Sequence, residues 1–406
     1  MIIDYYILGI YSNKIIMNAP FQNLQYCIRC CQPETTEKYE FDKDGICKTC
    51  QSSEDKMNID WSKREKKLKK ILTQAKKNAG NNYDCILPIS GGKDSFFQAH
   101  VLSKVYNLKP LAVTFNHNWF TEIGFFNLQL LLDTFNLDHF QFTPARNLVN
   151  KLARKSLFEI GDSCWHCHSG CGSFPLQVAT KFSIPLLVYG ESIAENSGRA
   201  RYSDGKTDFD KNYFTKVSAK KTPNEMTDKN ISKKDVFPFQ LPSDGAIKKN
   251  NIYQIHLGDY IFWDEEKQTE FIKKEYGWKE DKIEGAYKGY KSVECIMPGV
   301  HDFTCYLKRG FGRSTSQASV DIRNGLMTRE EGFKIANKKD PVKPNALKYY
   351  LDSVDMTEDE FYKVINSKKI NKLKDVNLPI YQNKSNQKSI KPFVQKLIDK
   401  HKKKVE

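Results

Sequence analysis

Residues 90–95, in the order Ser-Gly-Gly-Lys-Asp-Ser, are of the types that can hold a chain of phosphates. Two adjacent glycines let the backbone approach a ligand closely. The N–H groups of a turn that opens a helix converge on an anion. Lys93 adds a positive charge, and the two serines add hydroxyl donors. Asp94 would repel a phosphate unless a cation lay between them, so the segment also predicts Mg²⁺.

The segment must be positioned by a strand before it and a helix after it. An apolar run, 83–89, precedes it, and the apolar residues of 96–106 recur at helical spacing. The common phosphate loop requires Gly, four residues and then Gly-Lys-Ser/Thr. Here Leu87 stands in place of the first glycine and Asp94 follows the lysine, so this is a different loop. A glycine-rich turn without a ligand is the alternative.

Strand-like and helix-like segments alternate after residue 83. The expected strands are 83–89, 110–115, 138–142 and 185–189, and the expected helices are 94–106, 121–136, 147–159 and 172–183. This alternation predicts an α/β fold with a parallel sheet, whose ligands bind at the carboxyl ends of the strands. That edge should gather residues 90–95 with Asn116, His117, Gly190 and Glu191. His117 could contact a ligand or be an ordinary turn residue.

Two pairs of cysteines near the N-terminus have the spacing of a zinc ribbon. Each pair has two intervening residues, and the ligands would be Cys27, Cys30, Cys47 and Cys50. Lys38 to Phe41 alternates like a strand, and Asp44-Gly45 is typical of a hairpin turn. Cys31 is a spare thiol. A ribbon this small would take most of its folding energy from the metal.

A second cluster of thiols and imidazoles lies at 161–171. Cys164, Cys167 and Cys171 could hold a metal or an iron–sulfur cluster, or act as a reactive dithiol. A fourth ligand is not visible nearby, although His168, Cys295 or Cys305 could supply one. The plain alternative is a tight loop that lines a pocket.

Cations surround two glycines ahead of an expected helix at 314–324. They are Lys308, Arg309 and Arg313, and such a cluster suits a phosphate. Surface ion pairs are the alternative. Arg199 and Arg201, in a long segment without clear periodicity, could also reach a phosphate.

Composition limits the partners. The 406 residues carry a formal net charge of +15, which suits polyanions such as nucleotides, nucleotide-sugars or RNA. Eleven cysteines at short clustered spacings indicate metal ligands and not a secreted disulfide framework. No apolar run is long enough to span a membrane. We expect a cytoplasmic protein.

The motifs together resemble the N-acetyl sugar amidotransferase family of the pyrophosphate-loop, or N-type ATP pyrophosphatase, superfamily. The resemblance covers about residues 24–340 and rests on the cysteine pairs, the 90–95 loop and the later segments 121–124, 158–162, 164–168, 190–192, 258–260, 298–302, 308–313 and 321–323. That family acts in bacterial O-antigen and flagellin-glycan biosynthesis. The resemblance implies ATP, Mg²⁺ and Zn²⁺ as cofactors and an adenine-nucleotide alpha-hydrolase-like fold.

It also implies a reaction and a domain plan. An acetamido group on a nucleotide-sugar would become acetamidino through adenylation and attack by ammonia, which a separate glutaminase of the histidine-pathway type would supply. Together with the patterns along the chain, it leads us to expect an N-terminal extension (1–23), the zinc ribbon (24–58), a linker helix (59–80), the pyrophosphate-loop domain (81–340) with an insertion near 193–250, and a mainly helical basic C-terminal part (341–406).

The implied site residues follow the motifs. ATP and substrate would be bound by Ser90, Gly91, Gly92, Lys93, Asp94, Ser95, Asn116, His117, Gly190, Glu191, Lys308 and Arg313, with Lys93, Asp94, His301 and Arg309 as candidates for catalysis. The main rival function is tRNA thiolation, which cysteines 164, 167 and 171 and a basic charge would favour. A non-catalytic ATP-binding scaffold is a third possibility.

Overall fold

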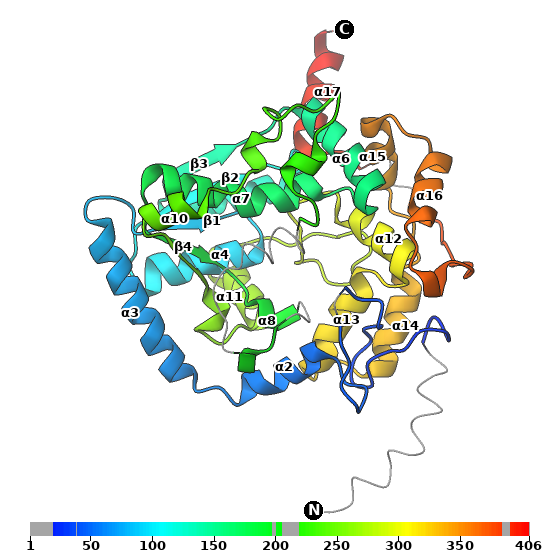
Figure 1. The fold of residues 1–406 in the computed structure, drawn as a ribbon, viewed down its shortest axis with the longest axis horizontal. Coiled ribbons are helices and arrows are strands. Elements are labelled where there is room, and N and C mark those ends of the chain that lie inside the picture. The colour runs from blue at the N-terminus through cyan, green and yellow to red at the C-terminus, as the bar shows by residue number, and fades with distance from the viewer. Residues whose placement is uncertain (1–18, 38, 197–199, 205–218, 384–389, 406) are drawn as a thin grey trace, which may run out of the picture.

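The computed structural model describes residues 19–37, 39–196, 200–204, 219–383 and 390–405. Its centre is a parallel sheet in the order β3-β2-β1-β4-β5 (Figure 1). The strands are β1 (Cys85–Pro88), β2 (Pro110–Phe115), β3 (His139–Phe142), β4 (Leu186–Tyr189) and β5 (Tyr253–His256). The expected α/β fold with a parallel sheet is confirmed. The chain order reverses between β1 and β4, which is where such sheets bind ligands.

Alternate residues of the strands pack into two separate cores, one on each face of the sheet. Leu87 lies in a core with the helices of one face, and its neighbour Ile86 lies in the core of the other face. The first face is covered by α3 (Trp61–Ala79), α4 (Lys93–Ala99), α5 (Glu122–Phe135) and α11 (Glu265–Tyr276), and the second by α7 (Trp165–Phe182). Helix α4 continues as a π-helical turn, η1 (His100–Val105).

Strand β5 is an element that sequence periodicity missed. Of its four residues only Ile255 is buried, because β5 lies at the edge of the sheet beside β4. A strand with one buried apolar side chain has no alternating pattern to detect.

The segment expected as an insertion near 193–250 is ordered where the structure describes it. It contains α8 (Ile193–Asn196), η2 (Tyr202–Asp204), η4 (Pro223–Met226), η5 (Phe237–Phe239) and α10 (Asp244–Lys249). Met226 and Phe239 are buried against Trp165 of α7. Arg201 pairs with Asp55, with a shortest N–O distance of 2.7 Å, and not with a phosphate-binding residue. Arg199 lies outside the described residues.

A third core, made of helices, lies beside the sheet (Figure 1). It joins α6 (Arg146–Ile160), α12 (Pro298–Arg309), α15 (Ala346–Val354) and α16 (Glu358–Ser367). Buried Tyr350 of α15 donates to the Ala153 carbonyl of α6 at 3.2 Å. The C-terminal helix is α17 (Phe393–Val405). Among the described residues, no helix combines the length and apolar character that a bilayer crossing requires.

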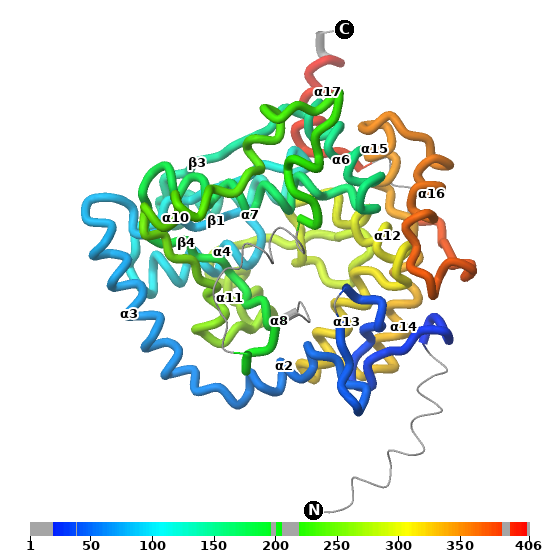
Figure 2. The backbone as a smooth tube through the Cα atoms, viewed as in Figure 1, coloured from blue at the N-terminus to red at the C-terminus, as the bar shows by residue number. Residues whose placement is uncertain are grey.

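The cysteine ribbon packs on α13 (Arg313–Arg323) and α14 (Arg329–Lys339), as the path of the tube in Figure 2 shows. The expected strand near 39–41 is reduced to one antiparallel bridge between Phe41 and Cys47. Gly45 makes the turn with φ of +79°. Cys31, the spare thiol, is fully buried, and its sulfur contacts the Arg329 carbonyl at 3.6 Å. It is therefore a packing residue. Helix α2 (Lys48–Met57) follows the ribbon.

Candidate functional site

The Ser-Gly-Gly-Lys-Asp-Ser segment is the turn from β1 into α4, at the carboxyl edge of the sheet. Its polar groups close the turn on itself. The Gly92 N–H donates to Ser90 Oγ at 3.3 Å, and Ser95 Oγ donates to the Gly92 carbonyl at 2.9 Å. The start of α4 is thereby fixed, and its first N–H groups are oriented as an anion site requires.

Gly91 is required by its backbone angle and by its neighbours. Its φ is +79°, a left-handed value that side chains disfavour. An added Cβ would lie 2.6 Å from the Leu128 nitrogen and 2.8 Å from the Gly124 carbonyl oxygen. The Gly91 carbonyl also accepts from Trp278 at 3.0 Å. The turn is thus packed directly against α5.

Lys93 is a buried cation in the middle of carboxylates. Its Nζ lies 2.6 Å from Asp94 and 3.9 Å from Glu265. Burial alone would lower the pKa of Lys93, but the charges of Asp94, Glu265 and Glu191 raise it above its ordinary value. The ammonium group is therefore charged, and it neutralises Asp94 in this structure.

A carboxylate that no sequence motif indicated, Glu294, lies beside the turn. Its Oε2 is buried and has no hydrogen-bond partner among the described residues. Burial and the charge of Asp94 raise the pKa of Glu294. An unpartnered buried carboxylate oxygen near a second carboxylate is a suitable place for a hard cation. Asp94 and Glu294 together fit the Mg²⁺ that the sequence predicted.

Glu294 is brought here by a distant stretch of chain. Thr121, which caps α5, donates its N–H to the Glu294 carbonyl at 2.9 Å. Position 124 on α5 requires glycine, because an added Cβ would lie 2.5 Å from the Glu294 Cα. Glu265 of α11 and Lys291 pair nearby at 2.7 Å. Glu265, Lys291 and Glu294 do not stand in a recognisable local motif, so sequence reasoning missed them.

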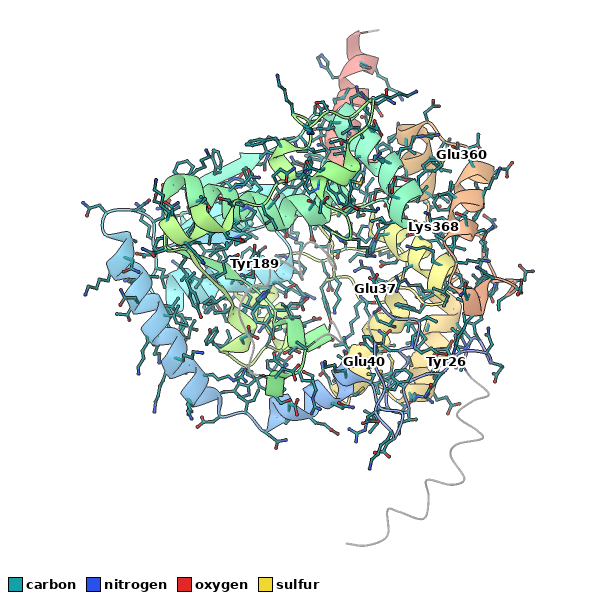
Figure 3. All side chains as sticks on the ribbon, in the orientation of Figure 1. Tyr26, Glu37, Glu40, Tyr189, Glu360 and Lys368 are labelled. Atoms are coloured by element: carbon teal, nitrogen blue, oxygen red, sulfur yellow. The ribbon has the colours of Figure 1, made fainter. Side chains whose placement is uncertain are left out.

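The turn opens onto a pocket of about 680 Å³. Its polar and charged lining residues in and near the turn are Ser90, Asp94, Ser95, Glu191, Glu294 and Arg313. Its lining thiols and imidazoles include Cys164, Cys167, His168, Cys171, Cys295 and His301. Tyr189, at the end of β4, is labelled in Figure 3 and lines the same pocket. The structure thus joins the expected phosphate turn and the second cysteine cluster in one cavity.

The residues after β2 and β4 divide between pocket and support. His117 lines the pocket, stacks on Phe120 with ring centres 4.5 Å apart, and has its pKa lowered to about 4 by burial, so it is neutral near pH 7. Asn116 instead accepts the Asn118 N–H at 2.8 Å and holds the turn. Gly190 accepts the Gly258 N–H at 2.9 Å and is not among the lining residues, whereas Glu191 is.

Asp162, Cys164 and His301 converge beside the pocket, which Cys164 and His301 line. His301 Nδ1 lies 2.9 Å from Asp162 Oδ1, which also accepts the Cys164 N–H at 2.9 Å. Burial opposes a charge on His301, but the carboxylate of Asp162 raises its pKa well above the ordinary value.

The expected trio of Cys164, Cys167 and Cys171 lines the pocket, but its sulfur atoms do not form one compact group. Among the described residues, two groups of three or more ligand atoms lie within 4.8 Å of one another. One is the ribbon, and the other joins Cys164 to Asp162 and His301. Cys171 is exposed on the surface of α7.

The three cations expected near a phosphate are separated by the fold. Arg313, at the start of α13, lines the pocket and pairs with Asp302. Lys308 is buried, and its Nζ lies 3.3 Å from the Ile160 carbonyl. Arg309 pairs with Glu37 of the ribbon at 3.1 Å. Lys308 and Arg309 are absent from the residues that line the pocket.

The ribbon cysteines Cys27, Cys30, Cys47 and Cys50 form a closed group. The sulfur atoms of Cys27 and Cys50 are 3.9 Å apart, and those of Cys30 and Cys47 are 3.7 Å apart. A tetrahedral zinc ion with bonds of about 2.3 Å would separate its sulfur ligands by about 3.8 Å. The four buried sulfurs could therefore hold a zinc ion.

Residues 284–391 match the C-terminal domain of the WbpG-like LPS biosynthesis proteins. The matched segment begins ten residues before Glu294 and includes His301, Arg313 and α12 to α15. This match supports a place, broadly, among proteins of lipopolysaccharide and glycan biosynthesis.

The chain is also similar to an uncharacterized protein of Methanocaldococcus jannaschii. The two are 31% identical over 97 residues, which are 24% of this chain and 34% of the archaeal protein. The chain thus spans about a third of the length of that relative.

Proposed function

We propose that this protein is an ATP-dependent amidotransferase that converts the acetamido group of a nucleotide-sugar into an acetamidino group. The observation that carries the proposal is the turn at residues 90–95, which lies at the carboxyl edge of a parallel sheet and opens onto the 680 Å³ pocket. The match to LPS biosynthesis proteins supports a sugar substrate and a role in surface-glycan synthesis. An adenine-nucleotide alpha-hydrolase-like fold is part of the proposal.

In this proposal the turn holds the β- and γ-phosphates of ATP. Backbone N–H groups of the turn and the Lys93 ammonium bind the phosphate oxygens. Lys93 must then leave the carboxylate of Asp94, with which it pairs in the free protein at 2.6 Å. Asp94 and Glu294 would hold Mg²⁺, which supplies charge neutralisation at the phosphates.

The proposed chemistry makes a poor electrophile reactive. The acetamido carbonyl oxygen attacks the α-phosphorus and displaces pyrophosphate. Ammonia then adds to the carbonyl carbon and loses a proton, and AMP departs with the former carbonyl oxygen. The carbon ends with two nitrogens, as in an acetamidino group. The protein's contribution is to position the reactants and to neutralise charge.

Arg313 and His301 are the remaining contacts that we propose for the substrate, since both line the pocket. Arg309 is left out because its guanidinium pairs with Glu37 of the ribbon. Ammonia would come from a separate glutaminase, and the reaction would take place in the cytoplasm, where ATP is available.

The decisive experiment measures pyrophosphate release from ATP and Mg²⁺ with an ammonium salt. Acetamido nucleotide-sugars and bulk tRNA are offered separately, and the products are analysed by mass spectrometry. The proposal expects sugar-dependent release and the small mass decrease that follows when NH replaces oxygen. If neither substrate leads to pyrophosphate release, even after a glutaminase and glutamine have been supplied, an ATP-binding scaffold would be favoured.

A second candidate function is tRNA thiolation. Four cysteines, Cys164, Cys167, Cys171 and Cys295, line the pocket that the phosphate turn opens onto. A thiolation enzyme could use such thiols to carry sulfur. Release of pyrophosphate only with tRNA and a sulfur donor, with a heavier RNA product, would move the assignment there.

A further inference from the structure

We propose that Asp162, Cys164 and His301 form a second metal site, for Zn²⁺, with one coordination position open to the pocket. Their three ligand atoms lie within 4.8 Å of one another. The site is distinct from the ribbon and from the turn at residues 90–95, and it shares His301 with the substrate contacts proposed above.

The fold brings the three side chains together in a defined way. Helix α6 ends at Gly161 with φ of +63°, and α7 begins after Cys164, so Asp162 and Cys164 share one tight turn. The Cys164 N–H donates to Asp162 Oδ1 at 2.9 Å, which fixes the carboxylate. His301 comes from the first turn of α12 and reaches the same carboxylate oxygen at 2.9 Å.

The donor set suits zinc. A thiolate, an imidazole nitrogen and a carboxylate oxygen are the three donor types that zinc accepts, with bonds of about 2.0 to 2.3 Å. Such bonds place ligand atoms roughly 3.3 to 3.8 Å apart, so small side-chain movements would complete the site. The soft thiolate disfavours Mg²⁺ and Ca²⁺.

Access decides what kind of site this is. Asp162 and Cys164 are 4% and 8% exposed, whereas Cys164 and His301 line the 680 Å³ pocket. The group is therefore buried at Asp162 and faces the cavity through Cys164 and His301. Three protein ligands with an open position are typical of zinc ions that bind or polarise a substrate, and not of purely structural ones.

A hydrogen-bonded pair without an ion is the competing explanation. It would rest on the Asp162–His301 pair and on the turn in which the Cys164 N–H donates to Asp162. The zinc content of the protein distinguishes the two explanations.

The test is the zinc content of the whole chain after saturation with zinc and removal of the excess. We expect two zinc ions per wild-type chain and one in both the Cys164→Ser and the Asp162→Asn variants. Cys171→Ser is the matched control, because Cys171 lies on the same helix and in the same pocket, and it should keep two. Circular dichroism verifies that every variant is folded.

Cobalt gives a second readout. In the cobalt-loaded protein, Cys164→Ser should lower the thiolate-to-cobalt absorption by about one part in five, since the ribbon supplies four thiolates and this site one. One zinc per wild-type chain would overturn the proposal. Loss of the second ion from Cys171→Ser but not from Cys164→Ser would also overturn it, because the ion would then belong to other thiolates.

Discussion

The ribbon group and the Asp162/Cys164/His301 group differ in donors, access and surroundings. The ribbon has four thiolates, all buried, and sits on α13 and α14. The pocket group has three different donors and one side facing a cavity. The ribbon is closed, so a metal there would stabilise structure, whereas the pocket group is open and a metal there could meet a ligand. Loss of a ribbon ligand should therefore unfold the ribbon, whereas loss of a pocket ligand should remove an ion from a chain that stays folded.

The largest expected effect is on the ribbon. Cys47→Ser should abolish its metal site, because metal binding contributes on the order of 10 kcal/mol to a domain that has almost no apolar core. Zinc analysis and limited proteolysis would show a lost ion and cleavage within 24–58. Cys31→Ser is the matched control, and it should keep the ion because Cys31 packs on the Arg329 carbonyl and is not in the four-sulfur group. Equal zinc loss in both variants would contradict this reading.

The next effect concerns activity. Lys93→Ala should reduce sugar-dependent pyrophosphate release by about 10² to 10³-fold, since a charged donor to the phosphates is lost. The melting temperature should also fall, because buried Lys93 neutralises carboxylates that would otherwise repel one another, so turnover is compared at a temperature where the variant is folded. Lys70→Ala, an exposed position on α3, is the control. Unchanged turnover in Lys93→Ala would remove the turn from the proposed chemistry.

A smaller expected effect is the pH dependence of stability that Asp340 causes at the start of α13, the helix on which the ribbon packs. Asp340 is buried and accepts the N–H groups of Gly312 and Ser314 at the start of α13, each at 2.8 Å. Burial raises its pKa from 3.8 to about 6, even though these hydrogen bonds lower it. The folded protein therefore keeps the proton to higher pH than the unfolded chain. The stabilisation that comes from protonated Asp340 is fully present below pH 3.8 and is lost as the pH rises through about 6.

Asp340→Asn should remove this pH dependence. The free energy of unfolding of the wild type, relative to the variant, should fall by at most about 3 kcal/mol between pH 4 and pH 6.5 and then stay level. Urea unfolding at several pH values measures it. A constant difference across that range would show that Asp340 ionises as an ordinary aspartate.

The smallest effect concerns the helix that holds the ribbon. Thr328 and Glu331 form a capping box at the start of α14. Arg329, the first residue of α14, donates to the Cys27 and Cys30 carbonyls. Thr328→Ala should cost about 1 kcal/mol of stability and speed zinc release to a chelator. Thr357→Ala, which removes a similar cap from α16 away from the ribbon, should cost as much without changing the release rate. Equal release rates would show that α14 does not tighten the metal site.

Local patterns predicted the parts of the molecule that depend on neighbouring residues. The parallel sheet and the cysteine group both followed from spacing within short segments. Edge strand β5 did not, because it buries only Ile255. The predicted ranges of the other four strands agree with the structure to within two residues at each end.

The site was harder to predict because it is assembled over long distances. Glu294 reaches the phosphate turn through a crossing at Thr121, and His301 meets Asp162 from 139 residues away. No local spacing contains that information. Arg309 shows the reverse case, since its position beside a glycine suggested a phosphate ligand while the fold directs it to Glu37.

Helix α12 carries His301 in its first turn and Arg309 at its last residue. The eight intervening steps correspond to about 12 Å along a rigid helix. One end borders the pocket and the other pairs with the ribbon. A partner bound to the ribbon would therefore contact one end of a rigid helix whose other end borders the pocket.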